Sequence, residues 1–287
     1  MKGFAMAERN PLIIMAAGKG SRMKASADVP EWVREEAASR PKAMIRIGQD
    51  RKPLLQHLVE LAREEGLRDI CIVMGERDEI TRPHFDTLTL DGINLSFVVQ
   101  TIPAGRTKPA GTAQAVQLAL EAHPDWAGTN VTVANGDNLP PKGMFTTLLS
   151  APCCLPAFDR EHLGLPANRV EAFAVIRRGS KGELIDIQEK PDPMAIEASQ
   201  WTDGTVRVSM NYFRMPWKDL LNAVQDVPEH PIRKERELPV AISLWNTANP
   251  GEMKVAPLSG AFLDLTHPED IAVAGERLDR GGHALLH

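Results

Sequence analysis

A short apolar run near the N-terminus ends abruptly in residue types that suit the binding of phosphate. The run covers residues 12–16, and the residues that follow it are Ala17, Gly18, Lys19, Gly20, Ser21 and Arg22. An apolar run that ends in a glycine-rich turn predicts a buried strand whose carboxyl end meets a polyphosphate. Glycines let backbone N–H groups approach phosphate oxygens, and Arg22 would add a planar fork of donors. The stretch therefore predicts a phosphate-binding loop.

The loop by itself matches neither of the two common phosphate-binding fingerprints. It has no Gly-Lys-Ser/Thr ending at the distance from a first glycine that a Walker loop requires, and it lacks the third glycine of the dinucleotide-binding fingerprint. An ordinary turn between a strand and a loop explains these residues equally well. The rest of the chain must decide between the two interpretations.

Helices and strands alternate in the first half of the chain. The clearest helix is predicted at 53–66, where leucines recur at helical spacing between Pro53 and Gly66. The apolar run 70–74 predicts a buried strand, so residues 12–74 predict a parallel strand–helix–strand unit with a right-handed crossover. Strands are also expected at 93–100 and 130–135, and helices at 111–122 and 144–149.

The second half has a less regular pattern. Its predicted strands are 153–158, 169–176, 184–189, 207–214, 253–257 and 261–265, and its predicted helices are 216–227, 238–246 and 267–278. A further helix at 28–38, with Asp28 as its cap, is expected as a lid or an insertion beside the glycine-rich loop. The predicted fold class is α/β, a Rossmann-like three-layer fold with a mostly parallel central sheet. We expect one domain over 1–287, with a nucleotide-binding half at about 11–150 and a second half at about 151–287.

The overall composition excludes several classes of protein. The chain has 287 residues, of which 43% are hydrophobic and 25% charged, and its net charge of -5 is unlike the basic footprint of a nucleic-acid-binding protein. Its three cysteines have no metal-ligand spacing. The sequence shows no signal-peptide pattern and no apolar run of membrane-spanning length. We therefore expect a cytoplasmic protein with reduced thiols and no nucleic-acid or membrane partner; the sequence leaves a homo-oligomer open.

Five short motifs follow one another along the chain. They are residues 16–23 with Arg40-Pro41-Lys42, Gln100 with 109–115, Asn135-Gly136-Asp137-Asn138, Ile187-Gln188-Glu189-Lys190-Pro191, and residues 261–266 around Asp264. In this order they resemble the motifs of the sugar-1-phosphate nucleotidyltransferases, the pyrophosphorylases that make nucleotide sugars and share the glycosyltransferase-A-like fold. Five motifs in the right order are far more specific than any one of them.

The resemblance implies a role for each motif. The nucleotide-binding residues would be Ala17, Gly18, Lys19, Gly20, Ser21, Gln100, Gly111 and Thr112. Arg22 would bind the leaving pyrophosphate, and Lys42 would stabilise charge at the α-phosphate. The residues that bind the sugar phosphate would be Ala174, Glu189, Lys190 and Asn211, and Asp137 and Asp264 would hold Mg²⁺.

The implied reaction needs positioning and charge neutralisation more than proton transfer. A phosphate oxygen of a sugar-1-phosphate attacks the α-phosphorus of a nucleoside triphosphate, and pyrophosphate leaves. The nucleophile is already an anion at neutral pH because the second pKa of a phosphate monoester is about 6. The absence of an obvious catalytic His or Cys–His pair therefore fits. Mg²⁺ commonly uses one or two carboxylates together with substrate phosphates.

Departures from the family pattern leave the acceptor open. Phe173-Ala174 stands where the family often has an aromatic residue followed by Gly, and Ser209-Met210-Asn211 stands where Asn-Thr-Gly or Thr-Gly is usual. Asp137 could instead cap the helix at 144–149, and Asp270 competes with Asp264 for the metal role. Three alternatives remain: nucleotidyl transfer to a non-sugar phosphate such as phosphocholine, a glycosyltransferase, and a non-catalytic nucleotide-sugar-binding regulatory subunit.

Overall fold

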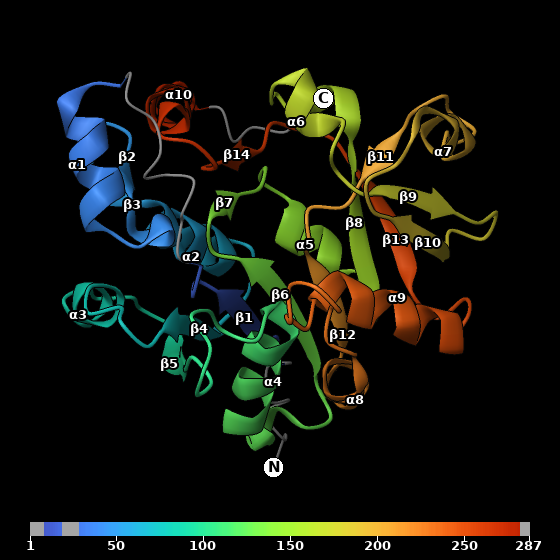
Figure 1. The fold of residues 1–287 in the computed structure, drawn as a ribbon, viewed down its shortest axis with the longest axis horizontal. Coiled ribbons are helices and arrows are strands. Elements are labelled where there is room, and N and C mark those ends of the chain that lie inside the picture. Colours follow the sequence, from blue (N-terminus) through green and yellow to red (C-terminus); the bar gives the residue numbers. More distant parts are fainter. Residues whose placement is uncertain (1–8, 19–28, 282–287) are drawn as a thin grey trace, which may run out of the picture.

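The computed structural model describes residues 9–18 and 29–281, which are built around a sheet of ten strands. The strand order is β10-β9-β11-β8-β12-β6-β1-β4-β5, with β13 paired to β8. Figure 1 shows the sheet crossing the molecule from β5 on the left to β10 on the right. The strands are β1 (Leu12–Met15), β4 (Asp69–Gly75), β5 (Asn94–Gln100), β6 (Asn130–Asn135), β8 (Cys154–Asp159), β9 (Val175–Arg178), β10 (Leu184–Gln188), β11 (Arg207–Val208), β12 (Phe213–Pro216) and β13 (Lys254–Leu258).

Two short antiparallel pairs lie outside this sheet, and helices cover both of its faces. The pairs are β2 (Arg46–Ile47) with β3 (Lys52–Pro53), and β7 (Asn138–Leu139) with β14 (Leu263–Asp264). The helices are α1 (Glu31–Ser39), α2 (Leu54–Glu64), α3 (Thr81–Asp86), α4 (Thr112–Ala122), α5 (Met144–Leu149), α6 (Ala167–Val170), α7 (Pro193–Ala198), α8 (Trp217–Asp226), α9 (Leu238–Ala248) and α10 (Glu269–Asp279).

Two hydrophobic clusters, one on each face of the sheet, follow from the alternation of side chains along its strands. On β1, Leu12 and Ile14 pack into the cluster that also contains buried residues of α1, α2, α5 and α10. Ile13 points the other way, into the cluster that contains buried residues of α4, α8 and α9. Successive side chains of a strand point to opposite faces, so one continuous apolar strand serves both clusters.

The predicted parallel arrangement is confirmed around β1. This strand lies between β4 and β6 and is parallel to both, and β5 is parallel to β4. The predicted helix 53–66 corresponds to α2, which links β1 to β4 within the predicted strand–helix–strand unit. The carboxyl ends of β1, β4, β5 and β6 therefore meet at one edge of the sheet, where open α/β sheets bind their ligands.

Beyond β6 the sheet becomes mixed. Strand β12 is antiparallel to β6, and β8, β11, β9 and β10 then pair antiparallel to one another or to β12, while β13 is parallel to β8. The Rossmann-like α/β fold is confirmed, with three parallel pairs around β1 and β4, while the second half is antiparallel apart from the β8–β13 pair.

Two predicted strands of the second half are wrong in part. Residues 169–176 were expected to form one strand, but α6 follows Pro166 and ends at Val170, and β9 begins only at Val175. The expected strand 207–214 is divided into β11 and β12. Asn211 lies between them with a φ of 60°, and a left-handed backbone conformation interrupts the extended pairing of a strand.

Helix α1 is anchored to the body of the protein by a buried carboxylate. It begins at Glu31, and the predicted cap Asp28 lies outside the described residues. Glu36 on α1 is 3% exposed and accepts hydrogen bonds from Arg46 Nε at 2.7 Å and from Arg51 Nη2 at 2.9 Å. Arg40 Nε lies 3.1 Å from the same carboxylate. These contacts fix α1 as a packed insertion beside residues 40–42.

Replacing Glu36 by Gln is expected to destabilise the fold, most strongly at neutral pH. Burial alone would raise the pKa of Glu36, but the hydrogen bonds from Arg46 and the charges of Arg46 and Arg40 more than offset this and lower it below its usual value of 4.5. The ion pairs therefore stabilise the fold at pH values above the unfolded-state pKa, and this stabilisation is lost as the pH falls through the lower folded-state pKa. We expect a loss of about 2 kcal/mol at pH 7, below the roughly 3 to 5 kcal/mol of a fully buried pair.

Urea unfolding of Glu36→Gln and the parent chain between pH 7 and pH 3 would measure this difference. The matched control is Glu35→Gln, because Glu35 is the exposed neighbour on the same helix. A difference between Glu36→Gln and the parent that stays constant down to pH 3 would show that the carboxylate charge contributes nothing.

The three cysteines lie in the interior of the protein. Cys71, Cys153 and Cys154 are free and buried, and burial raises the pKa of Cys71 and of Cys154 to about 11. Among the helices of residues 9–18 and 29–281, none combines the length and the apolar character needed to cross a membrane.

Candidate active site

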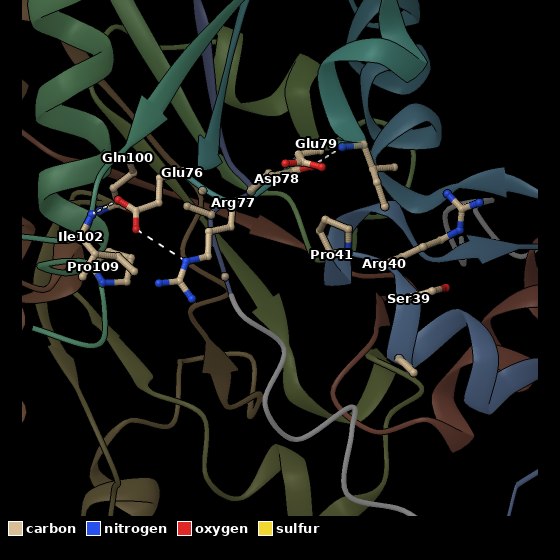
Figure 2. A pocket seen from close by; sticks show the side chains of 16 residues that line it. Ser39, Arg40, Pro41, Glu76, Arg77, Asp78, Glu79, Gln100, Ile102 and Pro109 are labelled. Carbon is tan, nitrogen blue, oxygen red and sulfur yellow. Dashed lines mark hydrogen bonds and ion pairs between the residues drawn. The ribbon is translucent and has the colours of Figure 1, made fainter.

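The carboxyl ends of β1, β4 and β5 border a cavity of about 500 Å³. Figure 2 shows Gln100, Glu76, Ile102 and Pro109 on one side of it and Ser39, Arg40 and Pro41 on the other. Ala17 and Gly18, two of the predicted nucleotide-binding residues, line it. Four further predicted residues, Lys19, Gly20, Ser21 and Arg22, lie outside the described part of the chain. The volume falls within the usual range for small-molecule sites.

Gln100 is buried in the cavity wall, and its neighbours fix the orientation of its amide. The residue is 3% exposed, and its Nε2 donates to the carbonyl of Gly111 and to Oε1 of Gln114, each at 2.9 Å. A backbone carbonyl can only accept, so the Gln100 atom that faces Gly111 is the amide nitrogen. Both amide hydrogens are used in this way. Gln100 therefore offers a ligand only its oxygen Oε1, which accepts no hydrogen bond from the described residues.

Gly111 and Thr112 pack against the segment 229–237, which precedes α9. The φ of Gly111 is 104°, and a Cβ atom on it would lie 2.3 Å from the carbonyl oxygen of Arg236. Thr112 Oγ1 accepts a hydrogen bond from the backbone N–H of Leu238 at 2.9 Å. The close backbone approach that explains a glycine at position 111 is thus made to Arg236. Contact of Gly111 and Thr112 with a nucleotide stays a prediction.

Lys42 and Asp137 form an ion pair at the same edge of the sheet, although 95 residues separate them. Lys42 Nζ lies 2.8 Å from Asp137 Oδ2, and the Lys42 side chain is 13% exposed while that of Asp137 is 38% exposed. Lys42 follows Pro41 at the start of a 3-10 turn, and Asp137 lies between β6 and β7. The structure therefore brings together the predicted catalytic lysine and one predicted metal ligand.

Asp264 lies beside Asp137 because β14 pairs with β7. Asp264 is opposite Asn138 in this antiparallel pair, and the backbone N–H of Leu265 donates to the carbonyl of Asp137 at 3.3 Å. Thr266 Oγ1 also donates to Asp264 Oδ2 at 2.7 Å. Both predicted metal ligands therefore lie on neighbouring segments of one small ladder.

Arg169 of α6 links the carboxylates of Asp264 and Asp270. Its guanidinium contacts Asp264 Oδ2 through Nη2 and donates from Nη1 to Asp270 Oδ1 at 2.8 Å. Asp270 Oδ2 accepts hydrogen bonds from the backbone N–H groups of Thr266 and His267 at 2.8 and 2.7 Å. Asp270 thus holds the turn before α10, which leaves Asp264 as the carboxylate next to Asp137.

A family model described as Nucleotidyl transferase matches residues 12–215, more than two thirds of the chain. The chain belongs to this family. The match covers β1, the Arg40-Pro41-Lys42 segment, Gln100, Asp137 and the Glu189-Lys190 pair, and it ends before β13 and β14. The family confirms the suspected relationship and indicates a nucleotidyltransferase that binds a nucleoside triphosphate. The position of Asp264 beside Asp137 comes from the β7–β14 pairing.

Beneath the two aspartates of this nucleotidyl transferase lies a buried polar pair that sequence reasoning missed. Tyr212 is fully buried, and its hydroxyl donates to Asn138 Oδ1 at 2.6 Å. Burial raises the pKa of Tyr212 well above its usual value, and the nearby charges of Asp137 and Asp264 raise it further. Tyr212 therefore stays protonated and supports β7. The sequence did offer a reason to single out Tyr212, because it is the only tyrosine of the chain and directly follows the predicted acceptor residue Asn211.

The register of the sheet places the predicted acceptor residues Ala174 and Glu189 near the level at which β6 ends. Arg214 pairs with both Thr132 and Cys154, so Phe158, four residues further along β8, is level with Gly136. Phe158 pairs with Val208, Val208 with Val175, and Val175 with Gln188. Because β9 runs in the same direction as β6 and β10 runs in the opposite direction, Ala174 and Glu189 each lie one residue from these pairs on the side away from Asp137. Ala174 and Glu189 therefore lie on the same sheet as Asp137 and within two residue positions of its level.

Two predicted acceptor residues have strained backbone conformations. The φ of Lys190 is 48° and that of Asn211 is 60°, in the left-handed region that is uncommon for residues other than glycine. Glu189 is exposed to solvent on one side, but desolvation by its protein neighbours raises its pKa, the charge of Glu237 raises it further, and Arg233 and Lys190 oppose both. Ala174 is buried, and its carbonyl accepts a hydrogen bond from Ser209. Strain of this kind concentrates at functional sites.

Proposed function

We propose that this protein transfers a nucleotidyl group from a nucleoside triphosphate to a sugar-1-phosphate and releases pyrophosphate. The observation that carries the proposal is the Lys42–Asp137 pair at 2.8 Å, at the carboxyl edge of the parallel strands that also borders the cavity. A triphosphate whose base lies in the cavity would extend its α-phosphate toward Lys42. The cytoplasmic location and the homo-oligomer stay predictions from the sequence.

The carboxylates at this edge suit Mg²⁺. The contacts of Asp137 with Lys42, and of Asp264 with Arg169 and Thr266, all use Oδ2, so each carboxylate keeps Oδ1 for a further ligand. No group of three or more His, Cys, Asp or Glu side chains suited to a metal occurs in the described residues. Mg²⁺ needs no such group, because it takes one or two carboxylates and completes its shell with phosphate and water oxygens. When bound, it would neutralise phosphate charge.

The residues of the chain would act by orientation and electrostatics. An oxygen of the acceptor phosphate forms a bond to the α-phosphorus, and the bond from that phosphorus to the bridging oxygen of pyrophosphate breaks. Lys42, held by Asp137, would place its ammonium group against the oxygens that gain charge in the transition state. Arg22 would bind the leaving pyrophosphate. No proton transfer is required, because the nucleophile is already ionised.

The acceptor would lie between Asp137 and the end of β10. Lys190 would bind its phosphate, and Glu189 would accept hydrogen bonds from sugar hydroxyls, with Ala174 and Asn211 beside it. A phosphorylated amino alcohol such as phosphocholine is the second candidate. Glu237 is close enough to raise the pKa of Glu189, and two neighbouring carboxylates would also suit a cationic head group.

A pyrophosphate-release assay tests the proposal. The full chain would be incubated with Mg²⁺, each common nucleoside triphosphate, and either a panel of sugar-1-phosphates or phosphocholine. We expect turnover with a sugar-1-phosphate and none after chelation of the metal with EDTA. Turnover with phosphocholine alone would overturn the sugar proposal in favour of the second candidate. Nucleotide binding without turnover of any pair would favour a regulatory subunit.

A further inference from the structure

The wall of the nucleotide cavity presents hydrogen-bond acceptors at the position where a base would be recognised. Gln100 offers only Oε1, because both of its amide hydrogens are donated to Gly111 and Gln114. Ala110 N–H donates to Gln114 Oε1 at 3.1 Å, which confirms that the Gln114 atom facing Gln100 is an oxygen. A base that contacts Gln100 must therefore bring a donor.

Glu76 adds a second acceptor beside Gln100. Gly75 and Gln100 are paired at the ends of β4 and β5, and Glu76 follows Gly75 directly. Its Oε2 accepts a hydrogen bond from the backbone N–H of Ile102 at 2.8 Å, which turns the side chain across the end of β5. Its Oε1 has only a distant contact, 3.9 Å from Nε of the largely exposed Arg77. Figure 2 shows Glu76 beside Gln100 and Ile102 on one wall of the cavity.

The pairing edges of the common bases differ in how many neighbouring donors they present. Uracil and thymine have one N–H between two carbonyls, and adenine and cytosine have one amino group next to a ring acceptor. Guanine alone has two adjacent donors, the ring N1–H and the exocyclic N2–H₂ group. We propose that this cavity selects a guanine nucleotide, with Gln100 Oε1 and Glu76 Oε1 accepting from these two donors.

The cavity also has apolar side chains that could contact the faces of a base, beside charged residues such as Arg77 and Asp78. Its apolar lining comes from Ala16, Ala17, Ile80, Ile102 and Pro109. Such side chains can contact the faces of a flat ring without selecting among bases, so selection falls to the polar edge. This inference rests on the proposed function in that it takes the cavity as the site of the nucleoside triphosphate.

Calorimetric binding without an acceptor tests the base preference separately from the reaction. The full chain with Mg²⁺ would be titrated with GTP, ATP, CTP, UTP, dTTP and inosine triphosphate, which keeps the N1–H of guanine but lacks its amino group. We expect GTP to bind at least about tenfold more tightly than the others, because a buried acceptor left without its donor is costly. Equal or tighter binding of UTP or dTTP, or no binding of any triphosphate, would overturn the proposal.

The Glu76→Gln variant tests the role of the carboxylate. Its amide oxygen can keep the hydrogen bond from Ile102, while its NH₂ group replaces the acceptor that faces the cavity. We expect the preference for GTP over inosine triphosphate to fall to about onefold, and to stay unchanged in Glu197→Gln, an exposed glutamate of α7. An unchanged preference in Glu76→Gln would overturn the assignment.

The two proposals can fail separately. Tight GTP binding without turnover of any sugar-1-phosphate would leave the guanine assignment standing and remove the sugar acceptor. Turnover of sugar-1-phosphates with dTTP in preference to GTP would leave the sugar acceptor standing and remove the guanine assignment.

Discussion

Replacing Lys42 by Ala is expected to lower kcat by about 10²- to 10³-fold, the usual cost of removing one preorganised charge from a transition state. The ammonium group lies 2.8 Å from Asp137 and is largely shielded from solvent, so its charge acts at short range in a poorly screened site. The affinity for the triphosphate should change by only a few fold if Lys42 acts mainly in the transition state. Steady-state kinetics and calorimetry on the same preparation would separate the two quantities.

Two further variants make this prediction specific. Lys52 of β3 donates to Glu60 of α2 at 3.1 Å. The Lys52→Ala variant therefore controls for the loss of one paired positive charge elsewhere in the protein. The double variant of Lys42→Ala with Asp137→Asn asks whether the two residues act as a unit. Residues that share one task show non-additive effects, so the double variant should be little worse than the more damaging single one. A normal kcat in Lys42→Ala would remove this residue from the reaction.

The parallel half of the fold was predictable because its signals are local. Strand β1 is wholly apolar, β4 is apolar between Asp69 and Gly75, and β6 carries Val131 and Val133 before it ends at Asn135. Helix α2 repeats its leucines at helical spacing between Pro53 and Gly66. Patterns of this kind need no knowledge of the partner segment. The misassigned stretch 169–176 shows the limit, since apolar residues there belong partly to the short helix α6 and partly to β9.

The candidate site was predictable in its motifs but not in its contacts. Lys42 and Asp137 stand out in the sequence, but only the fold shows that they touch. Arg169 carries no signal at all, because a single arginine between Asn168 and Val170 belongs to no motif, and its contacts to Asp264 and Asp270 span 95 and 101 residues. Tertiary pairing of this range depends on the whole sheet, so spacing along the chain does not reveal it.

The second half also supplies a connection between the two substrate regions. Segment 229–237 packs on Gly111, and Arg106 binds it through the Lys234 carbonyl at 2.7 Å. At the other end of this segment, the negative charge of Glu237 raises the pKa of Glu189. One segment thus packs on the loop that borders the cavity and brings the charge of Glu237 close to the predicted acceptor residue Glu189. Its contact with Gly111 can be tested directly.

Replacing Gly111 by Ala is expected to destabilise the protein by about 3 to 5 kcal/mol. The new Cβ would lie 2.3 Å from the carbonyl oxygen of Arg236 and 2.7 Å from its nitrogen. Both atoms already make backbone hydrogen bonds. Ala113 N–H donates to Arg236 O at 3.0 Å, and Arg236 N–H donates to Ala110 O at 2.7 Å. Relief of the clash must stretch or break these hydrogen bonds. Thermal unfolding should show a melting temperature lower by on the order of 10 °C.

Gly105→Ala is the matched control, because it separates backbone strain from the clash. Gly105 lies in the same loop with a φ of 78°, but its Cβ would meet nothing within 4 Å. Its substitution should cost only the strain of a left-handed alanine, about 1 to 2 kcal/mol. If both variants lose the same stability, the conformation of Gly111 matters and its packing on Arg236 does not. If Gly111→Ala keeps its stability and loses only nucleotide affinity, the glycine serves the base directly, as the sequence motif first indicated.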